Sequence, residues 1–376
     1  MSKEEDLQQI DDIRQALRTC EEPLYSGMDV GGTKIRTALV SESGRVFGFL
    51  KEKTPQQATA EETVQCIQAC VERVLEHFQR TLGDLAGLGI AVPGVVEPGT
   101  GNVVVTPNMN LTGIPLGKLL SNHFQIPVSI GNDGNLGTLG EAWRGAARGS
   151  QSTVGIFIGT GVGSGIVLHG ELWSGSAYAA GEIGHIVARA PVRTWRERLA
   201  GNAAPCPTDF DSHEFPLCGC NNLGCLESFC SRTAMEREFR DAIAQGVPTC
   251  LTEMTQGNVA RIKSGVLSKA LKVKDPLVMA VVEYAAEVLG YACLTVRHLL
   301  DPEVILLGGG VMEACAWFIL PIIEKIIDND RLPAASSPRR VVVSALGDDA
   351  VLLGAVALAI ADRFWVQEKR CKIIEK

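Results

Sequence analysis

The stretch YSGMDVGGTKIRTALV, residues 25–40, places two runs rich in apolar and β-branched residues on either side of Gly31-Gly32-Thr33. This pattern predicts a β-hairpin whose tip carries little side chain. A second stretch, STVGIFIGTGVGSGIVL at residues 152–168, repeats the order of strand, glycine-rich turn and strand. Two hairpins of one kind in distant parts of the chain indicate a duplicated architecture.

Strands alternate with helices along much of the remaining chain. Residues 61–82 have the apolar spacing of an amphipathic helix. Buried strands are predicted in LAGLGIAVPG (85–94), IPVSIGNDGN (126–135) and PEVILLGGGVM (302–312). This alternation predicts an α/β fold with largely parallel or mixed sheets.

The domain organisation follows from the duplication, although no low-complexity linker separates the halves. We expect an N-terminal extension over residues 1–25, whose helix at 5–18 has one apolar face. An accessory helix is the simpler interpretation of it, because a DNA-reading helix-turn-helix module needs more chain. We expect two lobes: a small α/β lobe over 26–133, completed by a C-terminal helix at 350–366, and a large α/β lobe over 134–349.

Composition narrows the class of protein. The chain has 376 residues, of which 46% are hydrophobic, so it can bury a large core in two domains. A formal net charge of −8 argues against sequence-independent binding of nucleic acid. The apolar segment 276–300 includes Glu283, Glu287 and Arg297, which favours a packed helix over a membrane span. The N-terminus is polar and acidic, unlike a secretory leader. Together with the twelve cysteines of the whole chain, this indicates a reducing compartment. We expect a cytoplasmic protein with no nucleic-acid or membrane partner.

The two glycine hairpins suit a polyphosphate better than a dinucleotide. GVGSGI at 161–166 is followed by more strand rather than by the helix that a dinucleotide motif must open. No Walker A loop is present. Glycines at the tips let backbone N–H groups approach phosphate closely, and Thr33 and Thr160 add hydroxyl donors. Asp29, at the end of the first strand, could hold a hydrated Mg²⁺. Either hairpin alone would be compatible with an ordinary tight turn.

A cysteine cluster lies in CGCNNLGCLE, residues 218–227. Three thiolates can converge on one ion, and a tetrahedral Zn²⁺ needs a fourth ligand, which His185 in AAGEIGHIV could supply. We therefore expect a structural zinc bound by His185, Cys218, Cys220 and Cys225. Cys206 and Cys230 are nearby substitutes, and three unconnected thiols are the alternative interpretation.

These motifs carry a resemblance at two levels. Through DVGGTKI, IGTGVGSGI and ILLGGG the sequence resembles the superfamily of actin-like, sugar-kinase and Hsp70-type ATPases. GEIGH followed by CGCNNLGCLE resembles the ROK family (repressors, open reading frames, kinases) over residues 26–362, with TPNMN and GNDGN closest to its glucokinase branch. The resemblance implies a two-lobed actin-like ATPase (ribonuclease H-like) fold, with a nucleotide and sugar cleft between the lobes.

The resemblance also implies the roles of individual residues. Asp133 would be the general base that accepts the proton of the attacking sugar hydroxyl; a helix cap or Asx turn is its alternative role. The sugar would contact Gly94, Asn108, Asn132, Asp133, Glu182, His185 and Glu227. The nucleotide and Mg²⁺ would contact Asp29, Gly31, Gly32, Thr33, Lys34, Gly159, Thr160, Gly161, Gly163, Gly308, Gly309 and Gly310.

The expected function is ATP-dependent phosphorylation of a hexose at the 6-hydroxyl, with glucose as the first candidate. Kinases for N-acetylmannosamine, mannose or fructose share this chemistry, and a sugar-responsive repressor of the same family is a third possibility. Family members commonly form homodimers, and some use polyphosphate in place of ATP. An apparent insertion at 189–216 is interpreted as a solvated loop, with a lid over the sugar or a subunit contact as alternatives.

Overall fold

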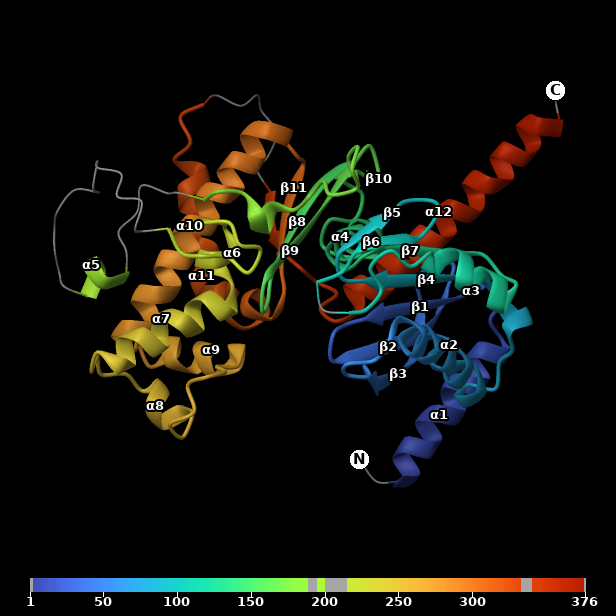
Figure 1. The fold of residues 1–376 in the computed structure, drawn as a ribbon, viewed down its shortest axis with the longest axis horizontal. Helices are drawn as coiled ribbons and strands as arrows, with labels where there is room; N and C mark the ends of the chain where they lie inside the picture. Colours follow the sequence, from blue (N-terminus) through green and yellow to red (C-terminus); the bar gives the residue numbers. More distant parts are fainter. Residues whose placement is uncertain (1–2, 108, 189–194, 200–214, 333–339, 375–376) are drawn as a thin grey trace. The chain divides into compact units, whose positions relative to one another are not determined.

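The computed structural model describes residues 3–107, 109–188, 195–199, 215–332 and 340–374 (Figure 1). The chain forms two compact units. The first comprises Met1–Gly149, Gly165–Gly181 and Asp348–Lys376, and the second comprises Ser150–Ser164 and Glu182–Gly347. The chain therefore passes from the first unit into the second and returns to the first over Gly165–Gly181. It then goes back to the second unit and ends in the first. The lobe boundaries expected from the sequence stay a prediction.

The first unit is built on a five-stranded sheet in the order β3-β2-β1-β4-β7. Its strands are β1 (Leu24–Val30), β2 (Lys34–Ser41), β3 (Val46–Lys53), β4 (Leu85–Val92) and β7 (Val128–Asn132). The predicted hairpin is confirmed, because β1 pairs antiparallel with β2. β4 runs parallel to both β1 and β7. The carboxyl ends of β1, β4 and β7 therefore share one edge, where open α/β sheets bind ligands.

Helices and one small hairpin complete the first unit: α1 (Lys3–Arg18), α2 (Ala60–His77), α3 (Leu116–Phe124), α4 (Asp133–Arg144), α12 (Asp349–Ile374), β5 (Val95–Glu97) and β6 (Asn102–Val105). Helix α2 begins one residue before the predicted start and ends five residues earlier than predicted. A capping box between Thr59 and Glu62 fixes its beginning. Its apolar stripe, including Ile67, Val71 and Val74, is fully buried in the core.

Glycines allow α12 to approach the sheet and α4 closely. A Cβ atom at Gly89 of β4 would overlap the carbonyl oxygen of Ala355, and one at Gly354 would overlap that of Leu136 in α4. Side chains at these positions would therefore push α12 away from β4 and α4. This close packing places Asp348 and the first residue of α12, Asp349, at the carboxyl end of β1.

The second five-stranded sheet has the order β10-β9-β8-β11-β12. Its strands are β8 (Ser152–Ile158), β9 (Val162–Leu168), β10 (Glu171–Leu172), β11 (Val304–Gly308) and β12 (Arg340–Val343). β11 runs parallel to both β8 and β12. The helices of the second unit are η2 (Ile183–His185), α5 (Trp195–Leu199), α6 (Glu227–Cys230), α7 (Arg232–Ala244), α8 (Leu251–Met254), α9 (Ser264–Lys272), α10 (Pro276–Leu300) and α11 (Gly310–Asp328).

Helix α10 is the packed helix that the sequence predicts. By length and composition it could cross a membrane, yet 67% of its most apolar window is buried inside the structure. It packs against α11 and α7, and Asp275 caps its first turn by accepting a hydrogen bond from Val278 N. The helix is therefore part of the core.

Part of the apparent insertion also packs on α10. Arg198 of α5 lies 3.3 Å from the carboxylate of Glu283 and 2.6 Å from that of Glu287. Residues 195–199 are therefore attached to the protein body, and the interpretation as a solvated loop is wrong for them. The rest of 189–214 lies outside the described residues.

Candidate active site and metal-binding group

A cluster of carboxylates lies in the first unit. Asp29 is in β1, Asp133 is the first residue of α4, and Asp348 directly precedes α12. Burial, with the charges of Asp133 and Asp348, raises the pKa of the Asp29 carboxyl to about 7, although the charge of Arg36 opposes this rise. A nearby cation would stabilise the ionised form of this half-buried carboxyl. Mg²⁺ prefers oxygen ligands of this kind.

Arg36 joins the start of α12 to this cluster. It is the register partner of Asp29 on β2. Its Nη1 donates to the carbonyl oxygen of Asp348 at 2.6 Å, and its Nη2 lies 2.6 Å from Asp349 Oδ1. Its guanidinium also stacks on the ring of Phe49, 4.2 Å from the centroid. Sequence reasoning missed Arg36, Asp348 and Asp349, because these contacts join residues far apart in the chain.

Three of the predicted sugar residues meet at the ends of β4 and β7. Asn132 caps α4, because its Oδ1 accepts from Asn135 N at 3.0 Å, and its Nδ2 donates to Gly94 O at 2.8 Å. Gly94 has φ +100°, and a Cβ there would overlap the carbonyl oxygen of Val105. The helix cap is thus Asn132 rather than Asp133, whose Oδ1 accepts from Gly134 N at 2.9 Å. Asn108 lies outside the described residues.

The tip of the first glycine hairpin is exposed. Gly31 N donates to Lys34 O at 2.9 Å and closes the turn, and Gln56 Nε2 donates to Gly32 O at 2.9 Å. Gly32, Thr33 and Lys34 face solvent. Their backbone N–H groups and the Thr33 hydroxyl are available to an anionic ligand.

The second glycine hairpin joins β8 and β9 through Gly159, Thr160 and Gly161, and Gly159 N donates to Gly161 O at 2.9 Å. Gly163 follows on β9 and is exposed. In the same unit β11 ends at Gly308, and Gly309, with φ +84°, caps α11, which begins at Gly310. A Cβ at Gly309 would lie 2.6 Å from Ile158 O, so only glycine lets these two strand ends come together.

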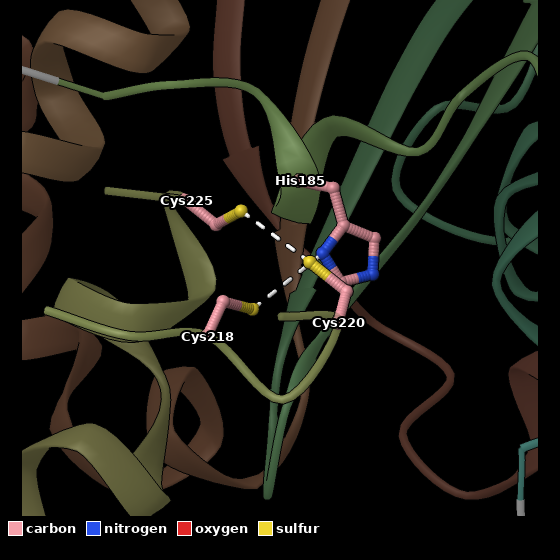
Figure 2. A group of neighbouring side chains, drawn as sticks. All are labelled: His185, Cys218, Cys220 and Cys225. Atoms are coloured by element: carbon pink, nitrogen blue, oxygen red, sulfur yellow. Dashed lines mark hydrogen bonds between the residues drawn. The ribbon is translucent and has the colours of Figure 1, made fainter. Parts of the chain in front are cut away.

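His185, Cys218, Cys220 and Cys225 form a group of the kind that binds zinc (Figure 2). Their ligand atoms all lie within 4.8 Å of one another. Cys218 Sγ is 3.7 Å from His185 Nδ1, and Cys220 Sγ is 3.6 Å from Cys225 Sγ. A tetrahedral Zn²⁺ separates sulfur and nitrogen ligands by roughly 3.5–3.8 Å, so the residues present fit the ion. The predicted substitute Cys230 instead donates to Ala285 O, and Cys206 lies outside the described residues.

The thiols of this group have different pKa values. A backbone hydrogen bond from Asn222 lowers the pKa of Cys220 to about 7, whereas burial raises that of Cys225 to about 12 and also raises that of Cys218. Because metal ligands are thiolates, a bound ion would displace the protons of the two buried thiols.

Of the three predicted sugar residues of the second unit, His185 belongs to this group, and Glu182 and Glu227 lie beside it. Glu182 Oε2 is 4.0 Å from His185 Nε2, the ring nitrogen that does not face Cys218. These two atoms are too far apart for a direct hydrogen bond, so Glu182 lies beside the ring of His185 without orienting it. Glu227 Oε1 is 3.6 Å from Cys218 Sγ, and its Oε2 accepts from Val162 N at 2.8 Å. The metal group therefore contains His185 and lies beside Glu182 and Glu227.

The two sheets with their glycine hairpins define a class of protein: two α/β lobes of the actin-like and ROK type. A crystal structure of a ROK family glucokinase from Streptomyces griseus, in complex with glucose and AMPPNP, matches with a TM-score of 0.72 at 28% identity, covering 90% of this chain and 99% of that one.

The family model described as "ROK family" matches residues 25–362, and the chain therefore belongs to the ROK family. A glucokinase of Halalkalibacterium halodurans is 31% identical over 88% of this chain and 93% of its own length. A xylose repressor of Caldicellulosiruptor bescii is 26% identical over 89% of this chain and 78% of its own length. Kinases for N-acetylated hexosamines are also relatives, at 28–29% identity. The predicted resemblance is confirmed at the level of the family.

Proposed function

We propose that this protein is an ATP-dependent hexose kinase that phosphorylates the 6-hydroxyl, with glucose as its substrate. The observation that carries the proposal is the carboxylate cluster of Asp29 and Asp133. Phosphoryl transfer needs a base near the attacking hydroxyl and a cation near the phosphates, and the cluster provides a carboxylate for each.

In the proposed reaction Asp133 accepts the proton of the sugar 6-hydroxyl while the hydroxyl oxygen forms a bond to the γ-phosphorus of ATP. The bond from that phosphorus to the β,γ-bridging oxygen breaks, and ADP leaves. Asn132, whose amide is oriented by the α4 cap and by Gly94, donates to a neighbouring hydroxyl. Asp29 would hold the hydration shell of Mg²⁺, which neutralises phosphate charge when bound. The glycine hairpins donate backbone N–H groups to the polyphosphate. We assign Zn²⁺ to the cysteine group, where it would orient Glu182, His185 and Glu227 toward sugar hydroxyls.

The relatives support this choice of substrate. The Halalkalibacterium halodurans relative is a glucokinase, and the Streptomyces griseus structure contains glucose and AMPPNP. Kinases for N-acetylated hexosamines are nearly as similar, so an N-acetylated sugar is the second candidate. Such sugars differ from glucose by one substituent, which a few pocket contacts discriminate.

A coupled ADP-release assay with MgATP and a panel of hexoses and N-acetylhexosamines tests the proposal. We expect turnover on glucose with a higher kcat/KM than on any N-acetylated sugar. A preference for an N-acetylated sugar would keep the kinase and replace the substrate. Absence of turnover with every sugar, repeated with polyphosphate as donor, would refute the kinase. Sugar-responsive DNA binding in a mobility-shift assay would then favour the repressor role.

A further inference from the structure

The chain directly after the metal group holds the tip of the second glycine hairpin with two charged side chains. Glu227, at the beginning of α6, accepts from Val162 N at 2.8 Å, and a Cβ at Gly161 would overlap its carboxylate. Arg232, at the beginning of α7, contacts the other side of the turn. Both follow Cys225 by only a few residues.

Arg232 contacts the hairpin through its backbone and its side chain. Its backbone N donates to Gly159 O at 2.9 Å, and its Nη2 donates to Thr160 Oγ1 at 2.7 Å. The neighbouring Thr233 Oγ1 donates to Thr160 O at 2.8 Å. The N-terminus of α7 therefore binds both carbonyl groups of Gly159 and Thr160 and the Thr160 hydroxyl.

The contact with the hydroxyl has a chemical consequence. A guanidinium has donors only, so Thr160 Oγ1 must be the acceptor. The Thr160 hydroxyl proton is then directed to another acceptor, and the positive charge behind the oxygen strengthens it as a donor. Because Thr160 is exposed at the tip of the turn, that acceptor can be a ligand oxygen.

A buried carboxylate fixes the guanidinium. Arg232 Nε lies 3.4 Å from Glu236 Oε1, one turn further along α7. Glu236 is only 7% exposed, and the same oxygen accepts from Ile262 N at 2.7 Å. A buried anion strongly favours a cationic partner, so Arg232 stays in place without a ligand.

We propose that Arg232 is a positioning residue for the phosphoryl donor: through Thr160 it presents a hydroxyl proton and a fixed turn to the phosphates of the nucleotide. The inference rests on the proposed kinase function and deepens it by naming the residue that sets donor affinity. Arg232 acts through Thr160, and sugar binding does not depend on it.

The test compares Arg232→Gln, Thr160→Val and the double variant with wild type. Arg240→Gln is the matched control, since Arg240 is an exposed arginine on the same helix. Steady-state assays give KM for ATP, KM for the sugar and kcat, calorimetry gives the Kd of AMPPNP, and thermal unfolding reports on folding. A hydrogen bond to a charged group predicts a rise of about tenfold in KM for ATP and in the Kd of AMPPNP for Arg232→Gln.

The sugar KM should stay unchanged in all variants, and the double variant should be no worse than the worse single variant, because the two residues act as one unit. Unchanged donor affinity in Arg232→Gln, or equal losses of donor and sugar affinity, would overturn the inference. If Arg232→Gln does not fold, Arg232→Lys replaces it, because lysine keeps a positive charge for Glu236 but lacks the forked guanidinium that contacts both Glu236 and Thr160. Unchanged donor affinity in that variant would likewise overturn the inference. Wild-type protein that neither binds AMPPNP nor turns over any sugar would refute the kinase itself, whereas an active wild type with unaffected variants refutes only the role of Arg232.

Discussion

Replacing Asp29 with asparagine should stabilise the metal-free protein at alkaline pH while it impairs turnover. In the folded chain, burial and the charges of Asp133 and Asp348 raise the pKa of this carboxyl from 3.8 to about 7. An ionised Asp29 therefore destabilises the fold, and the neutral amide of the substituted asparagine would relieve this penalty. Functional sites commonly carry such a cost, which a ligand removes.

The magnitude follows from the two pKa values. Below pH 3.8 the carboxyl is protonated in both states, and its full contribution to stability is present. As the pH rises to about 7, the unfolded chain ionises while the folded chain resists, and this contribution is lost. The whole change amounts to roughly 4 kcal/mol at 1.4 kcal/mol per pH unit, of which roughly 2–3 kcal/mol falls between pH 5 and pH 8.

Thermal unfolding measures the difference in stability between wild type and Asp29→Asn at pH 5 and at pH 8. The buffer contains no Mg²⁺ and no chelator that would remove zinc. Comparing the variants at each pH cancels the titration of all other groups. The exposed Asp241→Asn serves as the control for loss of one charge. Adding Mg²⁺ at pH 8 should stabilise wild type and leave Asp29→Asn unchanged.

The result that refutes this reasoning is a stability difference between wild type and Asp29→Asn that is the same at pH 5 and pH 8. The carboxyl would then ionise normally in the folded chain, and neither burial nor Asp133 would act on it as described.

Three further predictions concern the base, the metal and the packing. Asp133→Asn should reduce kcat by at least about 100-fold, as expected for loss of a general base, while calorimetry still detects sugar binding; near-normal turnover would remove Asp133 from this role. Purified protein should contain one zinc per chain by atomic absorption, and Cys225→Ser should lose the zinc and have a lower melting temperature. A wild type that is purified without metal and is as stable as Cys225→Ser would contradict the assignment. Gly354→Ala should destabilise the first unit by about 1–3 kcal/mol or more in urea unfolding, because its Cβ would overlap Leu136 O. The control Gly265→Ala, whose Cβ would have nothing within 4 Å, should be neutral or stabilising. Equal effects of the two substitutions would show that α12 can move away freely.

Local patterns in the sequence predicted much of the fold and part of the site. Glycine pairs between β-rich runs predicted the β1–β2 hairpin, and the cysteine spacing with His185 predicted the metal group. These predictions succeed because turn chemistry and the spacing of the three cysteines act over a few residues. Helix ends were less accurate, as the end of α2 at His77 shows, because fraying and capping are decided by the residues that pack around them.

Other features depend on contacts between residues far apart in the chain. Asp29 was identified from the end of its strand and Asp133 from the family resemblance, but the raised pKa of Asp29 depends on burial and on Asp348, which lies near the other end of the sequence. Arg36 reaches Asp348 only because glycines let α12 pack against β4 and α4. Similarly, no local pattern around Arg232 indicates that its guanidinium binds Thr160.

The sequence by itself therefore determined the glycine hairpin and the metal group, since turn chemistry and ligand type belong to the residues and their local spacing. The sugar and nucleotide contacts were implied by the family resemblance and stay predictions. The tertiary structure decided which charges lie beside the predicted site residues. The pKa of a carboxylate and the direction of a hydroxyl proton depend on neighbours within a few ångströms, and only packing brings Asp348 to Asp29 and Arg232 to Thr160.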